Sequence, residues 1–183
     1  MPKTRQAQRR RAPTRWSLMR TLQRVRLVAM DVDGVLTDAG MYYSESGDEL
    51  KKFNTRDGMG IKLLQAAGLV TAFITREKTA IVERRGQKLA VPEVHQGVDD
   101  KLALLTALAQ KYGLSLDQVA YIGDDVNDLE ALRAVGFSAA TADAMPSVLH
   151  AVQYICKKKG GEGAVREIAD LILAAQAAKP VKR

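Results

Sequence analysis

Acidic residues follow two apolar runs of this sequence, at the points where buried strands are expected to end. The run that starts at Leu27 leads into Asp31-Val32-Asp33-Gly34-Val35-Leu36-Thr37-Asp38, and the run that starts at Val119 leads into Gly123-Asp124-Asp125-Val126-Asn127-Asp128. Carboxylates at close quarters repel one another and need a cation, and an all-oxygen set of ligands selects a hard ion such as Mg²⁺. A carboxylate beside Mg²⁺ that faces a held phosphate is a nucleophile for phosphoryl transfer.

Two further residues are suited to hold phosphate oxygens. Thr75 ends the apolar run 70–74, and Lys101 begins the helix that follows a short strand expected at 94–96. Taken singly, such residues are more often helix caps, turn residues or solvated helix starts. Together with the carboxylates, and all at strand ends, the hydroxyl and the ammonium group predict a site that handles phosphate.

The elements that must position these residues alternate along the chain. We expect strands at 27–32, 70–74, 94–96, 119–122, 137–140 and 152–156, and helices at 14–24, 59–67, 79–89, 101–112, 125–134, 146–151 and 164–178. A β-hairpin with a glycine turn is expected where 41–43 and 50–53 flank 44–48. Strands that alternate with helices of about ten residues predict an α/β fold, with a parallel sheet and helices on both faces. Ligands of such sheets bind at the carboxyl ends of strands, where the strand order reverses.

Length and composition fit one globular domain, with 183 residues of which 46% are hydrophobic and 27% charged. The single cysteine, Cys156, excludes a disulfide framework and multi-cysteine zinc sites within one chain. No apolar run approaches the roughly 18–20 residues of a membrane span, so we expect a cytoplasmic protein without membrane contact. The expected organisation is a basic arm with a short helix over 1–26, a main domain over 27–178 and a tail over 179–183.

The net charge of +7 is concentrated at the N-terminus. Residues 1–26 hold nine Lys/Arg and no acidic residue, whereas the remainder holds 19 Lys/Arg against 21 Asp/Glu. We interpret the first 13 residues as a solvated, disordered arm, with nonspecific polyanion contact or a transit peptide as alternatives. The acidic remainder lacks basic stripes with interleaved aromatics, so specific nucleic-acid binding is not expected.

The motifs resemble those of the haloacid dehalogenase (HAD) superfamily phosphatases. The four motifs of that superfamily correspond here to 31–38, Thr75, Lys101 and 123–128. The stretches 53–61 and 160–167 are similar to the capless branch, which hydrolyses phosphates of 2-keto-3-deoxy sugar acids. The resemblance covers about residues 24–177. It implies a HAD-like, Rossmann-like sheet with a small hairpin insertion and no cap domain.

The spacing of the motifs agrees with a capless protein. Between Asp38 and Thr75 lie 36 residues, and between Thr75 and Lys101 lie 25, so neither gap can hold a cap domain. The resemblance implies that a tetramer covers the site instead, through the hairpin and C-terminal segment of a neighbour. The glycine run 160–163 suits a flexible connection to such a segment, although an ordinary turn before a helix explains it equally well.

The resemblance also implies a role for each motif residue. Asp31 would be the nucleophile that forms an aspartyl-phosphate, and Asp33 would protonate the leaving sugar oxygen and then activate water. Thr75 and Lys101 would hold and neutralise the transferring phosphoryl group.

Mg²⁺ is the cofactor that the resemblance implies. It would be bound by the Asp31 side chain, the Asp33 backbone carbonyl and the Asp124 side chain. Asp128 and Asp125 would not bind the ion themselves but would hold its ligands in place, with Asp128 orienting a water or Lys101.

The implied substrate is a small-molecule sugar-acid phosphate, 3-deoxy-D-manno-octulosonate 8-phosphate. Arg56 or Arg85 is suited to pair with its carboxylate. Besides Asp33 and Lys101, the residues expected to contact it are Asn54, Thr55, Arg56, Asp57, Gly58, Lys62, Glu77, Arg85 and Arg166.

The second motif departs from the eight-carbon pattern. It reads Thr75-Arg76-Glu77-Lys78-Thr79 where members acting on the eight-carbon acid read Thr-Gly-Arg. The Glu-Lys-Thr run is similar to relatives that act on nine-carbon 9-phosphates of the KDN (deaminated sialic acid) or N-acylneuraminate type, which stay an alternative. A receiver-like phosphoacceptor module is a remote alternative, because its phosphoacceptor follows the third strand rather than the first.

Overall fold

A parallel sheet forms the centre of the protein in the computed structural model, which describes residues 14–47 and 49–178. Within these residues the sheet has six strands in the order β5-β4-β1-β6-β7-β8. The strands are β1 (Leu27–Met30), β4 (Val70–Thr75), β5 (Glu93–Gln96), β6 (Val119–Gly123), β7 (Phe137–Ala140) and β8 (Tyr154–Ile155). The chain first extends from β1 to β4 and β5 and then returns to β6 on the other side of β1. The strand order therefore reverses at β1, where ligands of such sheets bind.

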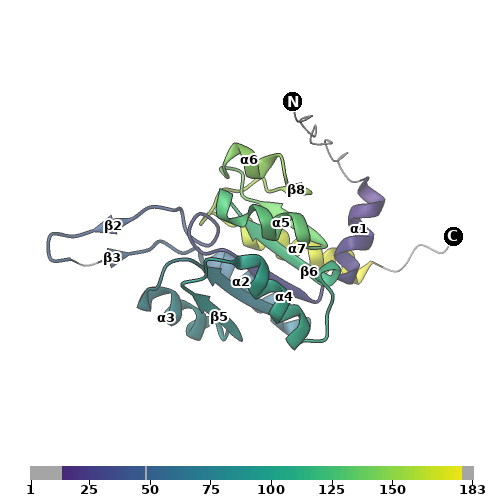
Figure 1. Cartoon of the computed structure of the whole chain (residues 1–183), viewed down its shortest axis with the longest axis horizontal. Helices are drawn as coiled ribbons and strands as arrows, with labels where there is room; N and C mark the ends of the chain where they lie inside the picture. The colour runs from purple at the N-terminus through teal and green to yellow at the C-terminus, as the bar shows by residue number, and fades with distance from the viewer. Residues whose placement is uncertain (1–13, 48, 179–183) are drawn as a thin grey trace, which may run out of the picture.

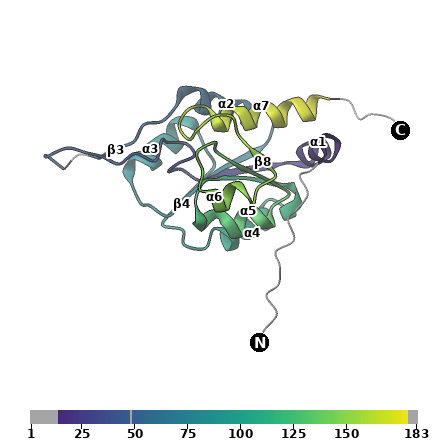
Figure 2. The same ribbon diagram turned by 90° about the horizontal axis from the view of Figure 1, so that it is seen from above.

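Helices cover both faces of this sheet (Figure 2). One face carries α1 (Arg15–Arg24), α2 (Thr55–Ala66), α3 (Ala80–Leu89) and α7 (Ala164–Ala177), and the other carries α4 (Lys101–Lys111), α5 (Leu129–Ala134) and α6 (Pro146–Leu149). The side chains of β1 alternate between the two cores: Val28 and Met30 face the first set of helices, and Leu27 and Ala29 face the second. Because both faces of β1 are buried, its sequence is continuously apolar. The predicted α/β architecture is confirmed.

A β-hairpin projects from the body of the protein (Figure 1). Its strands, β2 (Tyr42–Tyr43) and β3 (Glu49–Leu50), pair in antiparallel register, and Thr37 and Phe53 form an isolated bridge at its base. In the described residues, the hairpin and α2 occupy the first gap between motifs, and α3 and β5 occupy the second. The prediction of a hairpin insertion without a cap domain is confirmed.

The start of α2 differs from the prediction. The helix begins at Thr55, four residues before the expected start at Met59. The cause is Asn54, whose Oδ1 accepts a hydrogen bond of 2.8 Å from the backbone N–H of Arg56 and caps the helix. Residues 55–58, which were expected to contact the substrate, therefore form the first turn of a helix.

Other boundaries differ by smaller amounts. The helix expected at 125–134 starts as a 3₁₀ turn over Val126–Asp128 before α5 begins. The last strand shrinks from 152–156 to the two residues of β8, and the second hairpin strand ends at Leu50 rather than at residue 53.

The first helix packs against the body. Leu22 and Val25 are fully buried, and the side-chain amide of Gln23 donates a hydrogen bond of 3.1 Å to the carbonyl of Ala175 in α7. Trp16 is 51% exposed, with the Arg20 guanidinium 4.8 Å from its ring centroid. Leu18 packs against the core, because it precedes Leu22 by one helical turn.

The predictions for the two ends of the chain, a disordered segment over 1–13 and a tail over 179–183, lie outside the described residues. No helix in the described part of the chain has the length and apolarity to cross a bilayer.

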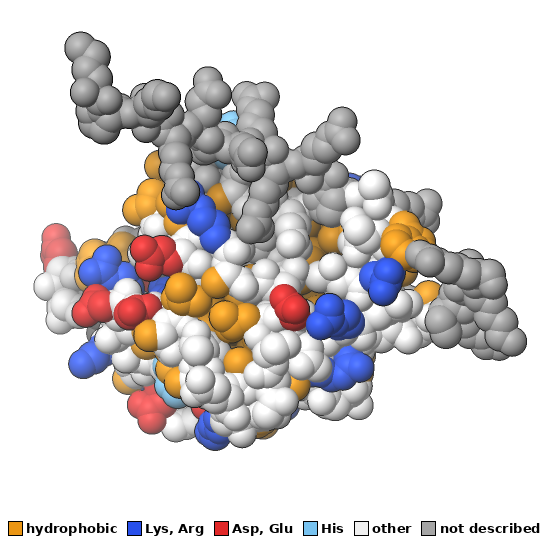
Figure 3. Space-filling view, turned by 45° about the vertical axis from the view of Figure 1, so that its right-hand side comes forward, with side chains coloured by type: hydrophobic (Ala, Val, Ile, Leu, Met, Phe, Trp, Pro, Cys, Tyr) orange, Lys and Arg blue, Asp and Glu red, His pale blue; other side chains and the backbone are white. Residues whose placement is uncertain are grey.

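Figure 3 shows acidic and basic side chains interspersed on one face of the molecule, around a small hydrophobic group.

Candidate active site

Asp31 and Lys101 form a buried ion pair at the carboxyl end of the sheet. Asp31 directly follows β1, and Lys101 is the first residue of α4, 70 residues later. The Lys101 Nζ donates a hydrogen bond of 2.7 Å to Asp31 Oδ2, while Asp31 Oδ1 accepts one of 2.7 Å from the N–H of Val32. Burial by itself lowers the pKa of Lys101, but Asp31 and Asp128 more than offset this and raise it. The lysine therefore keeps a positive charge in this site.

Asp128 holds Lys101 from the other side. Its Oδ1 accepts hydrogen bonds from Lys101 Nζ at 2.6 Å and from the Tyr121 hydroxyl at 2.7 Å. Its Oδ2 accepts one of 2.9 Å from the backbone N–H of Asp124. Asp128 is fully buried, and its oxygens are engaged by protein donors, so it can orient Lys101 and the Asp124 loop.

Three carboxylates meet here, and the ammonium group of Lys101 binds two of them, those of Asp31 and Asp128. Ligand oxygens of Asp31, Asp124 and Asp128 lie within 4.8 Å of one another, and Asp124 Oδ1 is buried without a hydrogen-bond partner among the described residues. Burial and the neighbouring Asp128 raise the pKa of Asp31 to about 7. Burial, Asp31 and Asp128 raise the pKa of Asp124 to about 8. A divalent cation would relieve this repulsion, because it neutralises the carboxylates that burial and crowding destabilise.

Gly34 allows the two acidic loops to approach each other. Its φ of +81° lies in the left-handed region, and an added Cβ would overlap the carboxylate of Asp124. Only glycine combines this backbone conformation with this close approach. The glycine of the first motif thus positions the carboxylate of the fourth.

The site opens into a cavity of about 210 Å³. Thr75 lies at its wall, 2% exposed, and its Oγ1 accepts a hydrogen bond of 3.2 Å from the N–H of Glu77. The residues that line the cavity are Asp31, Asp33, Ala39, Thr75, Arg76, Glu77, Asp124, Asp125 and Asn127.

Ala39, Arg76 and Asn127, which line the cavity, and Lys51 beside it were not among the site residues predicted from the sequence. Asn127 lines the cavity, and its buried Oδ1 has no hydrogen-bond partner among the described residues. Its position inside the fourth motif, 123–128, could have indicated from the sequence that it belongs to the site. Lys51, which follows β3 of the hairpin, contacts Asp33 and Glu77 with its Nζ at 2.6 Å from each carboxylate. Nothing in its local sequence separates Lys51 from the neighbouring surface lysine, Lys52.

Several residues expected to contact substrate bind other parts of the protein instead. The carboxylate of Asp57 is fully buried and accepts hydrogen bonds from the N–H groups of Gly163 and Arg166. The Arg166 Nε donates a hydrogen bond of 2.8 Å to Asp170, one turn further along α7. Asn54 donates from its side chain to the carbonyl of Gly161 at 3.1 Å. The Asp57 and Asn54 side chains tie the start of α2 to the start of α7 and the loop before it, the Arg166 side chain pairs within α7, and none of the three lines the cavity.

The remaining expected contacts lie around the start of α2. The Arg85 Nη2 donates a hydrogen bond of 3.0 Å to the carbonyl of Asn54, and an added Cβ on Gly58 would lie 2.7 Å from that nitrogen. Thr55 and Arg56 are exposed and Lys62 is half-buried. None of these residues lines the cavity in this chain.

The glycine run at 160–163 is packed, which favours an ordinary turn over a flexible connection, the two alternatives that the sequence left open. Gly160 and Gly161 are buried, and the N–H of Gly161 donates a hydrogen bond of 3.1 Å to the carbonyl of Val35. An added Cβ on Gly160 would overlap the carbonyl of Gly34. The run braces the loop that carries Asp31 and Asp33 and does not lead away from the protein.

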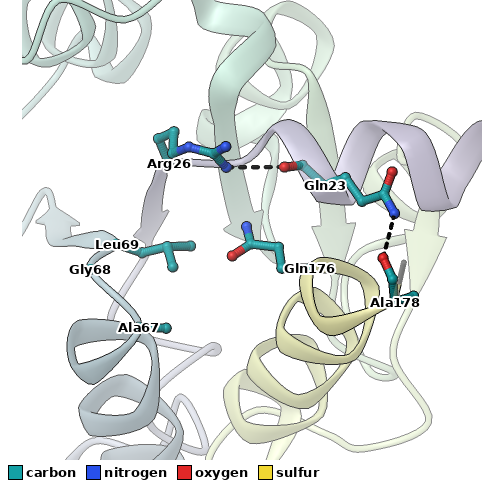
Figure 4. Close-up of a pocket in the computed structure, with 7 residues that line it drawn as sticks. All are labelled: Gln23, Arg26, Ala67, Gly68, Leu69, Gln176 and Ala178. Atoms are coloured by element: carbon teal, nitrogen blue, oxygen red, sulfur yellow. Dashed lines mark hydrogen bonds between the residues drawn. The ribbon is translucent and has the colours of Figure 1, made fainter. Parts of the chain in front are cut away.

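A larger cavity of about 510 Å³ lies at the opposite end of the sheet, near the starts of β1 and β4 (Figure 4). It lies between the ends of α1, α2 and α7, and the side-chain amides of Gln23 and Gln176 at its wall already donate to backbone carbonyls. It contains no carboxylate or hydroxyl side chain, and its residues are Gln23, Arg26, Ala67, Gly68, Leu69, Gln176 and Ala178. This cavity therefore offers no carboxylate or hydroxyl that could act as acid, base or nucleophile, in contrast to the smaller cavity.

Comparison with known proteins agrees with this geometry. The sequence profile of haloacid dehalogenase-like hydrolases matches residues 72–168. A 3-deoxy-D-manno-octulosonate 8-phosphate phosphatase of Escherichia coli is 40% identical over 164 residues, which cover 90% of this chain and 87% of that protein.

Two solved structures are similar over most of the chain. The phosphatase of the same name from Moraxella catarrhalis, in complex with magnesium, phosphate and KDO (3-deoxy-D-manno-octulosonate), has a TM-score of 0.87 at 40% identity and covers 89% of this chain and 94% of that one. The cobalt-bound phosphatase of Haemophilus influenzae has a TM-score of 0.82 at 40% identity and covers 85% and 91%.

Proposed function

We propose, from the premise that this chain belongs to the haloacid dehalogenase-like hydrolases, that it is a Mg²⁺-dependent phosphatase of 3-deoxy-D-manno-octulosonate 8-phosphate. The relatives that are 40% identical over most of its length carry that activity in their names. The observation that carries the proposal is the meeting of Asp31, Lys101 and Asp124 at one sheet edge beside a cavity.

The donor set fits magnesium. The carboxylates supply only oxygen ligands, they are crowded, and Asp124 Oδ1 is buried without a partner among the described residues. Hard cations with near-octahedral geometry prefer such ligands. The side chains of Asp31 and Asp124 and the backbone carbonyl of Asp33 would hold the ion. When bound, it would neutralise charge on the transferring phosphoryl group.

Asp31 is the nucleophile in this proposal. One of its oxygens attacks phosphorus, the bond from phosphorus to the sugar oxygen breaks, and an aspartyl-phosphate forms on Asp31. The position of Asp31 at the end of the rigid central strand supports this role, because a nucleophile must be held to within about 0.5 Å of the geometry from which it attacks. Lys101 and Thr75 present their ammonium and hydroxyl groups at the same edge and hold the phosphoryl oxygens.

Asp33 is the general acid and base. Its carboxyl gives a proton to the sugar oxygen as that oxygen leaves, and then takes one from the water that hydrolyses the aspartyl-phosphate. Phosphate is released and Asp31 is restored. Asp33 lies two residues from Asp31 and lines the cavity, which supports this pairing.

The experiment that tests this function measures phosphate release from the eight-carbon sugar-acid phosphate, with and without Mg²⁺. The wild-type protein should turn over only with Mg²⁺, and chelation should abolish turnover. Asp31→Asn preserves the size of the side chain but removes the nucleophile, so turnover should fall by at least about 10³-fold while the melting temperature stays close to that of wild type. Turnover of this variant within tenfold of wild type would contradict the assignment.

A nine-carbon sugar-acid 9-phosphate of the KDN or N-acylneuraminate type is a second candidate substrate. It is favoured by Glu77, which lines the cavity at the position where eight-carbon members carry arginine. A comparison of kcat/KM on both substrates separates the two candidates.

We infer that the protein assembles as a homotetramer whose hairpins cover neighbouring sites. The hairpin extends away from its own body (Figure 1) and exposes large apolar side chains, with Tyr43 69% and Leu50 64% exposed. Exposed apolar side chains on a projecting element favour burial against a partner. Light scattering coupled to size exclusion tests this assembly. Tyr43→Ser with Leu50→Ser should shift the mass from tetramer toward monomer, and a wild-type monomer would contradict it.

A further inference from the structure

Lys51 connects the hairpin to the catalytic edge of the sheet. Its Nζ lies 2.6 Å from Asp33 Oδ1 and 2.6 Å from Glu77 Oε2, and its side chain is only 1% exposed. The three residues come from three separate segments: the loop after β1, the chain after β3 and the loop after β4. One buried ammonium group therefore joins all three.

The ammonium group of Lys51 is firmly held by these contacts. It donates hydrogen bonds of 2.6 Å to Asp33 Oδ1 and of 2.6 Å to Glu77 Oε2. A third carboxylate, that of Glu49, lies 3.8 Å away. A buried charge of this kind is retained only where its partners are well placed, because its desolvation is costly. Lys51 thus fixes the carboxylates that it binds.

The two oxygens of Asp33 differ as a result. Oδ1 accepts the hydrogen bond of Lys51, whereas Oδ2 is buried without a hydrogen-bond partner among the described residues. Asp33 also lines the cavity beside Asp31. A carboxylate that is bound through one oxygen keeps its orientation, and its second oxygen stays free for another group.

We propose that Lys51 is a positioning residue for acid–base catalysis, which holds Oδ1 of Asp33 so that Oδ2 exchanges the proton with the substrate. The inference rests on the proposed function, since it takes Asp33 as the acid and base. The proton on Oδ2 passes to the sugar oxygen as the bond from that oxygen to phosphorus breaks. Oδ2 then takes a proton from the water whose oxygen forms the new bond to phosphorus. Glu77 anchors Lys51 in this arrangement.

Steady-state kinetics on the sugar-acid phosphate test the positioning role. General acid–base catalysis contributes roughly 10²–10⁴-fold to rates, so Lys51→Met is expected to lower kcat by about 10–100-fold and to change KM by less than about threefold. Lys51→Arg keeps the charge and should recover part of the lost kcat. Lys52→Met is the matched control, because Lys52 is 59% exposed and its ion pair, at 3.3 Å, is with Asp38. It should turn over like wild type.

A second substrate separates positioning from a folding defect. The 4-nitrophenolate of 4-nitrophenyl phosphate leaves without needing a proton, so only the hydrolysis of the aspartyl-phosphate still requires Asp33. In rapid mixing, Lys51→Met should release about one nitrophenolate per active site in a fast burst and then turn over slowly. A partly unfolded variant would lose burst amplitude and steady rate in the same proportion.

The outcomes distinguish this inference from the function on which it rests. A loss confined to KM, an unchanged kcat, or the absence of a burst from folded Lys51→Met would overturn the positioning role. An inactive wild-type protein or an active Asp31→Asn variant would instead contradict the proposed function. A burst followed by slow turnover, with partial recovery in Lys51→Arg, would support both.

Discussion

The carboxylate of Asp57 accepts a hydrogen bond of 2.9 Å from the backbone N–H of Arg166, across 109 residues of sequence. It accepts a second one, of 3.1 Å, from the N–H of Gly163, and the side chain is fully buried. Helix α7 has a glycine at its N-cap and hence no capping side chain of its own. Asp57, in the first turn of α2, supplies the missing acceptor, so a cap joins the two helices.

Replacement of Asp57 should therefore lower the stability of the protein and leave substrate binding almost unchanged. Asp57→Ala leaves the buried N–H of Gly163 and the partly buried N–H of Arg166 without an acceptor, which should lower the free energy of unfolding by about 2–4 kcal/mol. KM for the sugar-acid phosphate should change little at temperatures where the variant is folded. Urea denaturation and steady-state kinetics check the two parts. Asp170→Ala is the control, because it removes only the surface pair with Arg166, which contributes about 0–1 kcal/mol. A large rise in KM without loss of stability would restore Asp57 as a substrate ligand.

Magnesium should bind more tightly as the pH rises. Burial and neighbouring carboxylates raise the pKa of Asp31 to about 7 and of Asp124 to about 8, so at neutral pH the folded protein without metal is protonated mainly on Asp124 and only in part on Asp31. A cation must displace those protons, which makes its affinity lower below these pKa values and highest above them. Isothermal titration calorimetry in two buffers of different ionisation enthalpy counts the protons released. A Kd for Mg²⁺ that is the same at about pH 6 and about pH 9 would contradict this coupling.

Charge reversal at Glu77 should change both substrate choice and rate. Glu77→Arg places a second cation beside Lys51, which then has no carboxylate on this loop to bind and is repelled from it. The ratio of kcat/KM should shift toward the eight-carbon 8-phosphate by roughly 10–200-fold, and kcat should fall on both substrates. Glu77→Gln, which removes the charge without reversing it, should lower kcat less. If Glu77→Arg leaves the ratio of the two kcat/KM values unchanged, Glu77 serves only as a partner of Lys51.

Glu93 should stabilise the protein in a pH-dependent manner. It is buried at the start of β5, a position that by itself raises its pKa, but hydrogen bonds from Lys111 and Tyr112, at 2.5 Å each, and from His95 lower the pKa to about 2. Because the folded pKa lies below the ordinary value of 4.5, the stabilisation is complete above pH 4.5 and is lost as pH falls toward 2.

Melting curves of Glu93→Gln check this prediction. The variant should be less stable than wild type by about 1–3 kcal/mol at neutral pH, and the difference should shrink in acid. Glu130→Gln, at an exposed position of α5, should change stability by less than about 0.5 kcal/mol at any pH. A difference between wild type and Glu93→Gln that stays constant down to about pH 2 would mean that the charge of Glu93 contributes nothing.

The reaction class could be predicted from the sequence because it depends on local patterns. Asp31 and Asp124 each follow a buried apolar run, and the carboxyl ends of parallel strands share one edge of the sheet, so residues far apart in the chain must meet there. The gap lengths between motifs likewise exclude a cap domain, because 36 and 25 residues are too few to form one. Element types followed from periodicity, and their ends were less certain because a cap such as Asn54 can move a helix start by a turn.

The contacts of Asp57, Arg166 and Lys51 depend instead on tertiary packing. Asp57 was expected at the substrate and instead caps α7, and Arg166 pairs with Asp170. Lys51 and Lys52 are indistinguishable by type and neighbourhood, yet one is buried between Asp33 and Glu77 and the other is exposed. The physical reason is that such contacts depend on how whole elements pack, since side-chain direction in a two-residue strand or a first helical turn is set by partners distant in sequence. Spacing along the chain places a residue at an edge of the sheet, and packing determines which atom it meets there.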